Sequence, residues 1–283
     1  MLHGSLCREI LVWRHSAQLI VAQPKGVPML ERLAIGLASA LLLAAIGAAF
    51  RHRQYLILAL RCVVLSRNKK LRVSMAAILS VSHDERYILV RNRHRPETFG
   101  PIGGVYKYYA GAREQLDRCG YIPQVRDEDM KYDLRGFIKG KDFPSFMRWF
   151  LSGKNREIEP ITRELIEELG EVGLTKESET IHAVQFELVK TIYEMIDVVQ
   201  GADYAQFRYF AVYQLCPDEP KSEMVKDILC RGSENNPKII AVTAKEIMLR
   251  RATSGEEIAT HTEYLIHDKR IGPEPPPFME ARG

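Results

Sequence analysis

The residues best placed to do chemistry are the glutamates of residues 162–170. In a helix, Glu164, Glu167 and Glu168 share one face, which Glu171 extends by a further turn. Like charges on one face repel one another, so the arrangement costs stability unless a cation lies in front of it. Clustered carboxylates suit a hard divalent ion such as Mg²⁺, shared with substrate phosphates. A solvated acidic face is the alternative.

The composition is that of a folded protein with a substantial core. The 283 residues suffice for one large or two small domains, with 46% hydrophobic and 27% charged residues. The net charge of +4 is spread along the chain, so we expect no DNA binding. Five scattered cysteines without a C-x-x-C motif argue against disulfides and zinc, and indicate a reducing compartment.

A long uncharged segment lies near the N-terminus. Residues 33–50 contain no charged side chain and are long enough to cross a bilayer. Arg51 and Arg53 follow at once, as in a stop-transfer flank, although the small residues 47–49 also suit a signal-peptide cleavage site. A buried core helix seldom lacks a polar face for so long. We therefore expect a transmembrane anchor at residues 33–53.

The flanks of this segment predict its orientation and its partners. More basic residues follow the span than precede it, which favours a single pass through the inner (plasma) membrane with the C-terminal part in the cytoplasm. Small residues recur every four positions at Gly36, Ala40, Ala44 and Ala48. This stripe permits close helix packing and predicts a homo-oligomer, although alanine is common in such helices. Residues 1–32 form a short N-terminal segment, and Met29 could equally be the true start.

The remaining boundaries follow from composition. Residues 54–70 are apolar and basic, and Arg61 interrupts them, which predicts a neck or an interfacial helix in contact with membrane lipid. Residues 71–268 form the predicted cytoplasmic domain, with an insertion at about 110–158. The proline-rich tail 269–283 is predicted to be disordered.

Within the domain, 71–81 and 86–91 have strand patterns, and 82–85 predicts the turn of a hairpin between them. Further strands are predicted at 181–196, 206–215 and 238–242. In the second of these, Phe207, Tyr209 and Tyr213 face one side, and Arg208 and Phe210 the other.

Helices are predicted at three further places. One begins near Asp142 and Pro144, with a core or oligomer stripe of Phe143, Phe146, Met147, Phe150 and Leu151. Another begins at Thr243, which forms a capping box with Glu246, and a further helix is expected at 254–266.

Candidate ligand contacts follow the predicted hairpin. Four cationic residues could bind phosphate: Arg91, Arg93, His94 and Arg95. A solvated strand end is an equal alternative. Gly103 and Gly104 predict a bend where the backbone approaches another group closely. Tyr106 or Tyr108 could stack on a base.

Residues 163–170, read as R-E-aliphatic-x-E-E-x-G, resemble the second half of a Nudix box. The resemblance implies an α+β fold, a Nudix-like α/β/α sandwich with a mixed sheet. It also implies that Glu164, Glu167 and Glu168 hold a divalent metal and that Arg163 orients them by ion pairing. Glu167 and Glu168 would be catalytic if hydrolysis is retained. Such metals neutralise charge on phosphate and activate water.

The sequence departs from this pattern upstream. Where the family has a glycine and a glutamate before the box arginine, this chain has Trp149 and Asn155. If Gly104 is the box glycine, a long insertion separates it from Arg163. The aliphatic position after the box is Glu171. The resemblance therefore favours the Nudix fold more strongly than retained hydrolysis.

The whole layout resembles the SMODS-associated NUDIX effectors of bacterial CBASS antiphage systems, over roughly residues 30–266. The shared features are one N-terminal span, a basic neck, the run at 91–108 and a late box. The resemblance implies a membrane effector that binds a cyclic oligonucleotide made by a partner CD-NTase. Binding would trigger membrane disruption and death of the infected cell. The alternative is a membrane-tethered, Mg²⁺-dependent hydrolase of a nucleoside diphosphate derivative.

Overall fold

The computed structural model describes residues 37–40, 42–43, 53–93, 95–174, 184–196, 199, 201–217 and 219–271. The chain divides into two compact units, 1–53 and 54–283, and the fold that follows is that of the second. Among the described residues, no helix is long and apolar enough to cross a membrane. Most of the predicted span, including Gly36, Ala44 and Ala48 of its small-residue stripe, lies outside the described residues, as do residues 272–283 of the tail.

A helix occupies most of the predicted neck. In α3 (Arg53–Val64), Leu58 and Cys62 are buried in the domain core, and the Tyr55 hydroxyl donates to the Pro144 carbonyl at 3.4 Å. The other face and the residue after the helix expose Leu56, Ile57, Leu60, Val64 and Leu65. The helical form agrees with the expectation, and its contact with lipid stays a prediction.

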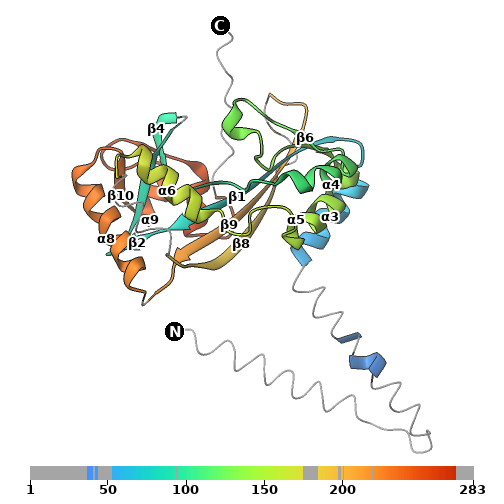
Figure 1. Ribbon diagram of the computed structural model, residues 1–283, viewed down its shortest axis with the longest axis horizontal. Coiled ribbons are helices and arrows are strands. Elements are labelled where there is room, and N and C mark those ends of the chain that lie inside the picture. The colour runs from blue at the N-terminus through green and yellow to red at the C-terminus, as the bar shows by residue number, and fades with distance from the viewer. Residues whose placement is uncertain are drawn as a thin grey trace, which may run out of the picture. The chain divides into compact units, whose positions relative to one another are not determined.

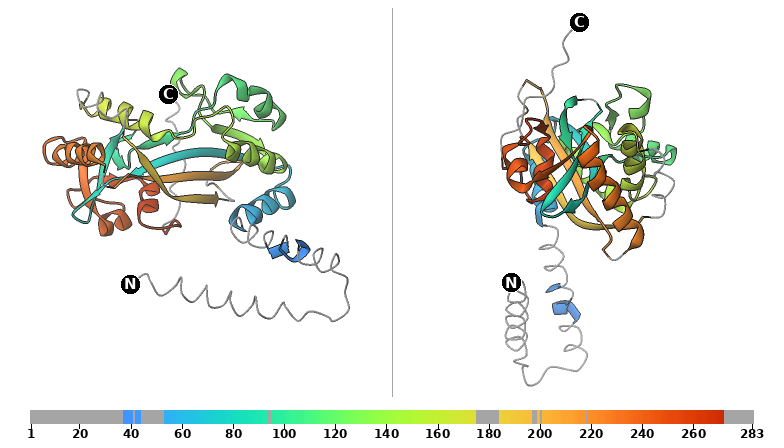
Figure 2. Two further views of the ribbon diagram at one scale, coloured as in Figure 1. Left: turned by 60° about the horizontal axis from the view of Figure 1, so that its bottom comes forward. Right: turned by 90° about the vertical axis from the view of Figure 1, so that its left-hand side faces the viewer.

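The larger of two sheets contains six strands and has mixed pairing. Its order is β6 (Ile122–Pro123), β7 (Arg135–Lys139), β1 (Lys70–Ser80), β9 (Ala205–Leu215) and β8 (Phe186–Ile196), and β5 (Gly103–Val105) also pairs with β1. Strands β1 and β9 are parallel, whereas the other pairs are antiparallel. Figure 2 shows the long strands β1, β8 and β9 side by side.

The second sheet is smaller and more irregular. It runs β10 (Ile239–Thr243), β3 (Arg86–Asn92), β4 (Arg95–Gly100) and β11 (Glu257–Ile258), with β2 (Ser82–His83) on β3. Strands β4 and β11 are parallel, and the other pairs are antiparallel. The mixed pairing in both sheets confirms the predicted α+β class.

The chain passes from one sheet to the other at Val81, so the predicted hairpin between 71–81 and 86–91 is wrong. The two residues of β2 pair back onto β3 across a turn at Asp84 and Glu85, and the Ile88 N–H donates to the Val81 carbonyl at 2.9 Å. Both turn residues have positive φ, of 47° and 62°, which matches the tight turn of a two-residue hairpin. The local turn was predictable, but β1 pairs with β5, β7 and β9 rather than with β3.

Alternation along β1 divides the core in two. Leu71, Val73 and Met75 belong to one cluster, whereas Ala76 and Ile78 belong to the other. Helices α3, α5 (Phe143–Ser152), α6 (Ile161–Glu171) and α8 (Pro220–Asn235) contribute to the first cluster. The short helices α9 (Ala244–Leu249) and η5 (Thr260–Leu265) contribute to the second, which fills the space between the sheets. Figure 1 shows α8, α9 and β10 at one end of the long strands β1, β8 and β9, and α3, α4 and α5 at the other.

Several local predictions can be compared with these elements. On β9, Phe207, Tyr209 and Tyr213 lie in the first cluster and Phe210 in the second, as expected from alternation. The stripe of α5 is core at Phe143, Phe146, Met147 and Phe150, whereas Leu151 is exposed. Both hydrogen bonds of the capping box of Thr243 and Glu246 are present. Cys119, Cys216 and Cys230 are free thiols in the described part of the chain.

Other elements differ from the sequence-based expectation. The helix predicted at 254–266 is instead β11 followed by the 3₁₀ helix η5. The segment 110–158 contains α4 (Arg113–Arg118), strands β6 and β7, and the 3₁₀ turns η1 (Ala110–Ala112), η2 (Glu128–Met130) and η3 (Gly140–Asp142). The insertion therefore extends the main sheet rather than forming a separate lobe.

Candidate functional site

Helix α6 is anchored by an apolar stripe. Ile161, Leu165 and Leu169, four residues apart, are fully buried and fix the rotation of the helix. The carboxylate of Glu159 accepts hydrogen bonds from the backbone N–H groups of Ile161 and Thr162 at the N-terminus. The glutamates of the predicted box therefore lie on a different face from the stripe, directed toward β5.

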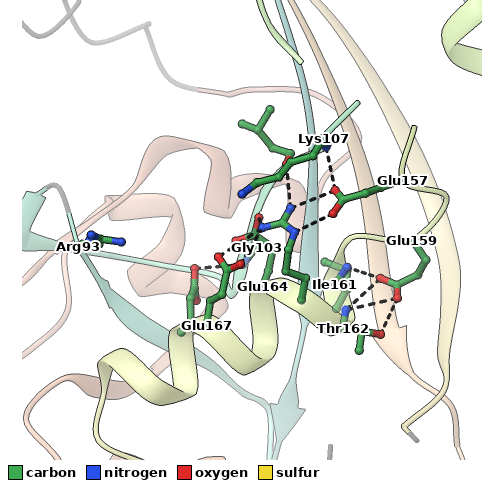
Figure 3. Close-up of polar contacts among 12 residues, drawn as sticks. Arg93, Gly103, Lys107, Glu157, Glu159, Ile161, Thr162, Glu164 and Glu167 are labelled. Carbon is green, nitrogen blue, oxygen red and sulfur yellow. Dashed lines mark hydrogen bonds and ion pairs between the residues drawn. The ribbon is translucent and has the colours of Figure 1, made fainter. Parts of the chain in front are cut away.

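Arg163 holds the glutamates in place. Its Nη1 lies 2.7 Å from Oε1 of Glu164 and 3.3 Å from Oε2 of Glu167, and its Nη2 donates to the Val105 carbonyl at 3.1 Å. On its other side, Nε and Nη2 reach the two carboxylate oxygens of Glu157 at 2.7 and 3.1 Å. Figure 3 shows these contacts, with Glu157 on one side and Glu164 and Glu167 on the other. The geometry is that of an orienting residue.

Glu157 supplies a contact that the sequence pattern placed elsewhere. The family position for the upstream glutamate is Asn155, which instead donates to the Gly111 carbonyl. Glu157 also accepts from the backbone N–H of Lys107 at 2.8 Å, so it ties the box helix to the segment after β5. The carboxylate thus lies two residues later in the sequence than the family pattern places it. A motif with fixed spacing cannot detect such a shift.

The two glycines of β5 are required by close packing. A Cβ atom on Gly104 would overlap the carboxylate of Glu164, and one on Gly103 would overlap the Ala77 carbonyl. The Gly103 N–H donates to Oε1 of Glu168 at 3.3 Å. The double glycine thus marks a close approach of the backbone, and the approaching group is the box helix itself.

Burial changes the protonation of two box glutamates. Desolvation raises the pKa of Glu164 to about 7, against an opposing effect of Arg163. Desolvation and the neighbouring Glu164 raise the pKa of Glu168 well above its usual value. Oε2 of Glu168 is buried and has no hydrogen-bond partner among the described residues. These carboxyls are therefore held in an environment that a cation would stabilise.

The fit to a divalent metal is partial. Carboxylate oxygens are the ligands that Mg²⁺ prefers. Glu167, with half of its side chain exposed, is paired with Arg163, and no three histidine, cysteine, aspartate or glutamate residues in the described part of the chain converge as a metal site. Glu164 and Glu168 therefore fit a cation that takes its other ligands from water or a bound phosphate.

These glutamates line a pocket of about 240 Å³. Its walls come from residues within 90–93, 100–107, 127–135 and 163–171, together with His261. The pocket thus lies where the end of β3, the double glycine, the insertion and the box helix meet. Its lining combines cations with carboxylates, as expected of a site for a phosphorylated ligand and a metal.

The family is shown by comparison with known protein families. The model of the SMODS-associated NUDIX domain matches residues 70–266. The chain belongs to this family. The match extends from β1 to just beyond η5, so it includes both sheets and every wall of the pocket. No curated protein and no solved structure matched the chain. Membership confirms the SMODS-associated NUDIX family that the sequence resembled.

In this NUDIX domain, the predicted cationic contacts separate into three groups. Arg91 and Arg93 line the pocket, whereas Arg95 does not, and His94 lies outside the described residues. Arg93 connects the box helix to the insertion, because its guanidinium lies 3.4 Å from Glu171 and 3.8 Å from Asp129. Both pairs are exposed and therefore weak enough to be exchanged for a phosphate.

Arg91 is held differently. It donates to the Pro237 carbonyl at 3.0 Å, and its guanidinium lies 5.5 Å from the centre of the Phe99 ring. The contacts leave Arg91 on the pocket wall in a defined orientation.

Tyr106 belongs to the core of the NUDIX domain rather than to the pocket. Its side chain is 2% exposed, makes an edge contact with Phe150 at 5.4 Å, and shares a hydrogen bond with the Tyr213 hydroxyl at 3.4 Å. This geometry leaves no face for base stacking. Tyr108 is partly buried against Tyr121 and Tyr132 and does not line the pocket.

Several pocket residues were not found from the sequence: Lys107, Asp127, Asp129, Asp133, Arg135 and His261. The insertion supplies four of them, because β7 joins the main sheet and carries the segment before it to the box helix. An acidic run around Asp127–Asp129 was a possible signal, but acidic loops are common on protein surfaces.

His261 comes from the C-terminal part of the NUDIX domain. Its ring is parallel to that of Phe210, with 3° between the planes and 6.0 Å between the centres. Desolvation and the nearby Arg208 and Arg270 lower the pKa of His261 to about 4. The ring is therefore neutral at physiological pH, as a donor or acceptor in the pocket wall.

Proposed function

We propose that this chain is the membrane effector of a CBASS antiphage system. Its NUDIX domain senses a cyclic oligonucleotide made by a partner CD-NTase and triggers membrane disruption and death of the infected cell. Membership of the SMODS-associated family supports the setting. The observation that carries the proposal is the pocket, where cationic side chains face the carboxylates of the box helix.

The charges of the pocket support an anionic ligand. Arg91, Arg93 and Lys107 line the pocket and can contact phosphate oxygens, while Glu164 and Glu168 in the same lining can share a cation with that phosphate. A phosphodiester would compete with Glu171 and Asp129 for Arg93. Ligand binding would thereby change the contacts between the insertion and the box helix.

The N-terminal segment supports a response at the membrane. The uncharged residues 33–50 and the apolar exposed face of α3 precede the sensing domain. A ligand can drive assembly only if it binds the assembled state more tightly than the separate subunits. The predicted small-residue stripe would let the spans of such an assembly pack closely.

Binding can be measured by calorimetric titration of the full chain in lipid nanodiscs with a panel of cyclic di- and trinucleotides. We expect one of them to bind, and Arg93→Gln to weaken it about tenfold, as for loss of one charge-assisted contact. Arg231→Gln, on the exposed surface of α8, is the matched control because its partner is also an exposed carboxylate. Absence of binding across the whole panel would reject the sensor role.

A second candidate is a membrane-tethered hydrolase of a nucleoside diphosphate derivative, favoured by the buried pair Glu164 and Glu168. These residues would hold Mg²⁺, which when bound lowers the pKa of water and neutralises phosphate charge. Arg163 would keep the Glu164 carboxylate directed toward the pocket, and the Gly103 N–H would do the same for Glu168.

The hydrolase predicts phosphate release that requires Mg²⁺ and collapses in Glu167→Gln and Glu168→Gln. Glu234→Gln, an exposed glutamate of α8, is the control. Activity that is unchanged in both box variants would exclude this candidate.

A further inference from the structure

The face of the main sheet next to the pocket carries arginines. Across β7, β1 and β9, Ser74 is in register with both Arg135 and Arg208, so their side chains share one face. Arg72, two residues before Ser74, lies on the same face. The opposite face of β1 is the core, where Val73 and Met75 are fully buried.

Two of these arginines make no direct ion pair among the described residues, although Asp133 and Glu164 act on Arg135 from beyond contact distance. Nε of Arg135 is buried without a hydrogen-bond partner among the described residues, and neither Arg135 nor Arg72 forms an ion pair within that part of the chain. Arg72 donates from Nε to the side-chain oxygen of Gln124 at 2.8 Å, which is a neutral acceptor. Arg208 differs, since Glu194 lies 3.5 Å from it.

The positive charge gathered around Arg72 is visible in the electrostatics. Desolvation, and then the neighbouring Arg135 and Arg208, lower the pKa of Arg72 to about 10. Desolvation also lowers the pKa of Arg135, with Arg126 acting in the same direction and Asp133 against it. Buried like charges are unfavourable, and a bound anion would relieve both the repulsion and the missing hydrogen bond.

The pocket and this face are continuous through Arg135. Its side chain lines the pocket of about 240 Å³, which is smaller than the range of about 300–1,000 Å³ typical of small-molecule sites. A ligand with two phosphodiesters would therefore extend beyond the pocket. The aromatic rings of Phe137 and Tyr204, in edge contact at 5.3 Å, border the face beside Arg72.

We propose that Arg72 and Arg135 form a phosphate subsite that holds a second phosphodiester of the nucleotide whose first phosphate enters the pocket. This inference rests on the proposed function for the identity of the ligand, although not for the anion site itself. Guanidinium groups bind phosphate oxygens with two parallel hydrogen bonds, which the vacant Nε of Arg135 can join. The nearby aromatic rings favour a nucleotide over inorganic phosphate.

The test uses the full chain in phosphatidylcholine nanodiscs, with Arg72→Gln, Arg135→Gln and the control Arg231→Gln. The melting temperature is measured in sodium phosphate and in sodium chloride of equal ionic strength, and the cyclic dinucleotide panel is titrated by calorimetry. In wild type and the control, phosphate and one cyclic dinucleotide raise the melting temperature. In Arg135→Gln, the affinity for that dinucleotide falls at least tenfold, as for loss of a charge-assisted contact.

The unliganded variants separate a binding role from a structural one. Because the arginines repel one another, Arg72→Gln and Arg135→Gln keep or raise the melting temperature without ligand. Wild-type affinity for the nucleotide in both variants would overturn the inference, whether or not their melting temperatures fall. The sensor role would remain intact in that case. If phosphate stabilises only chains with both arginines and no cyclic di- or trinucleotide binds, the anion site stands and the proposed function fails. No stabilisation of wild type by either ligand would reject the subsite.

Discussion

At the scale of residues, the site depends on how α6 is held against β5. Arg163 connects Glu157, Glu164 and Glu167, while the absence of a side chain at Gly104 leaves room for the Glu164 carboxylate. The sequence identifies the box glutamates by their spacing. It does not identify Glu157, because the loop before the helix places that carboxylate at a different spacing from the family pattern.

The pair Glu157 and Arg163 gives a stability prediction. Their side chains are 13% and 24% exposed and make two parallel hydrogen bonds, so Glu157→Gln should lower the free energy of unfolding by about 2 kcal/mol. Chemical denaturation of the full chain measures the change. Glu128→Gln, which breaks a solvent-exposed pair with Lys131, should leave the free energy of unfolding nearly unchanged. Equal losses of unfolding free energy in the two variants would contradict a stabilising role of the Glu157–Arg163 pair.

A substitution at Glu168 should change the free energy of unfolding in the opposite direction. Its carboxyl is buried beside Glu164 with one oxygen unpaired, so Glu168→Gln should raise the free energy of unfolding by about 1 kcal/mol in the absence of divalent ions. The same change should remove the stabilisation that Mg²⁺ gives to the wild type. Thermal unfolding with EDTA and with Mg²⁺ tests both effects, with Glu234→Gln as control. A variant that is destabilised without metal, yet still responds to Mg²⁺, would refute a cation at this position.

At the scale of elements, local patterns predict structure well only where neighbours in sequence decide it. The capping box of α9 and the alternation along β9 are of this kind. Helix α8 was not predicted because its buried stripe includes Ser222 and Gly232 beside Val225 and Leu229, which weakens its apolar signal. The pairing of β1 with β9 and β7 depends on contacts distant in sequence.

His261, in helix η5, predicts how the stability of the fold depends on pH. The folded-state pKa of about 4 lies below the ordinary value of 6.5, so the unfolded chain binds the proton more tightly between these values. Stability is therefore full above pH 6.5 and is lost on acidification toward pH 4, by about 1.4 kcal/mol per pH unit at most. His261→Phe keeps a ring against Phe210 and should remove this part of the pH dependence. Parallel profiles of wild type and variant in denaturation at pH 7, 5.5 and 4.5 would contradict the assignment.

At the scale of the whole molecule, the order of parts along the chain was the most informative feature of the sequence. The late box, the cationic run and the neck together indicated the family, which the match over residues 70–266 shows. The architecture of the pocket was less predictable, because the insertion closes one wall by adding β7 to the sheet. Arg72 and Arg135 gave no local signal, since only the pairing of β1 with β7 brings them together.

In the proposed function, a nucleotide messenger acts through the NUDIX domain on the membrane. The most direct measurement is the membrane potential of cells that express the full chain, with and without each candidate cyclic nucleotide synthase. We expect the potential to collapse with one synthase only, and to persist in Arg93→Gln but not in Arg231→Gln. Loss of potential without any messenger, or with every synthase alike, would contradict the account.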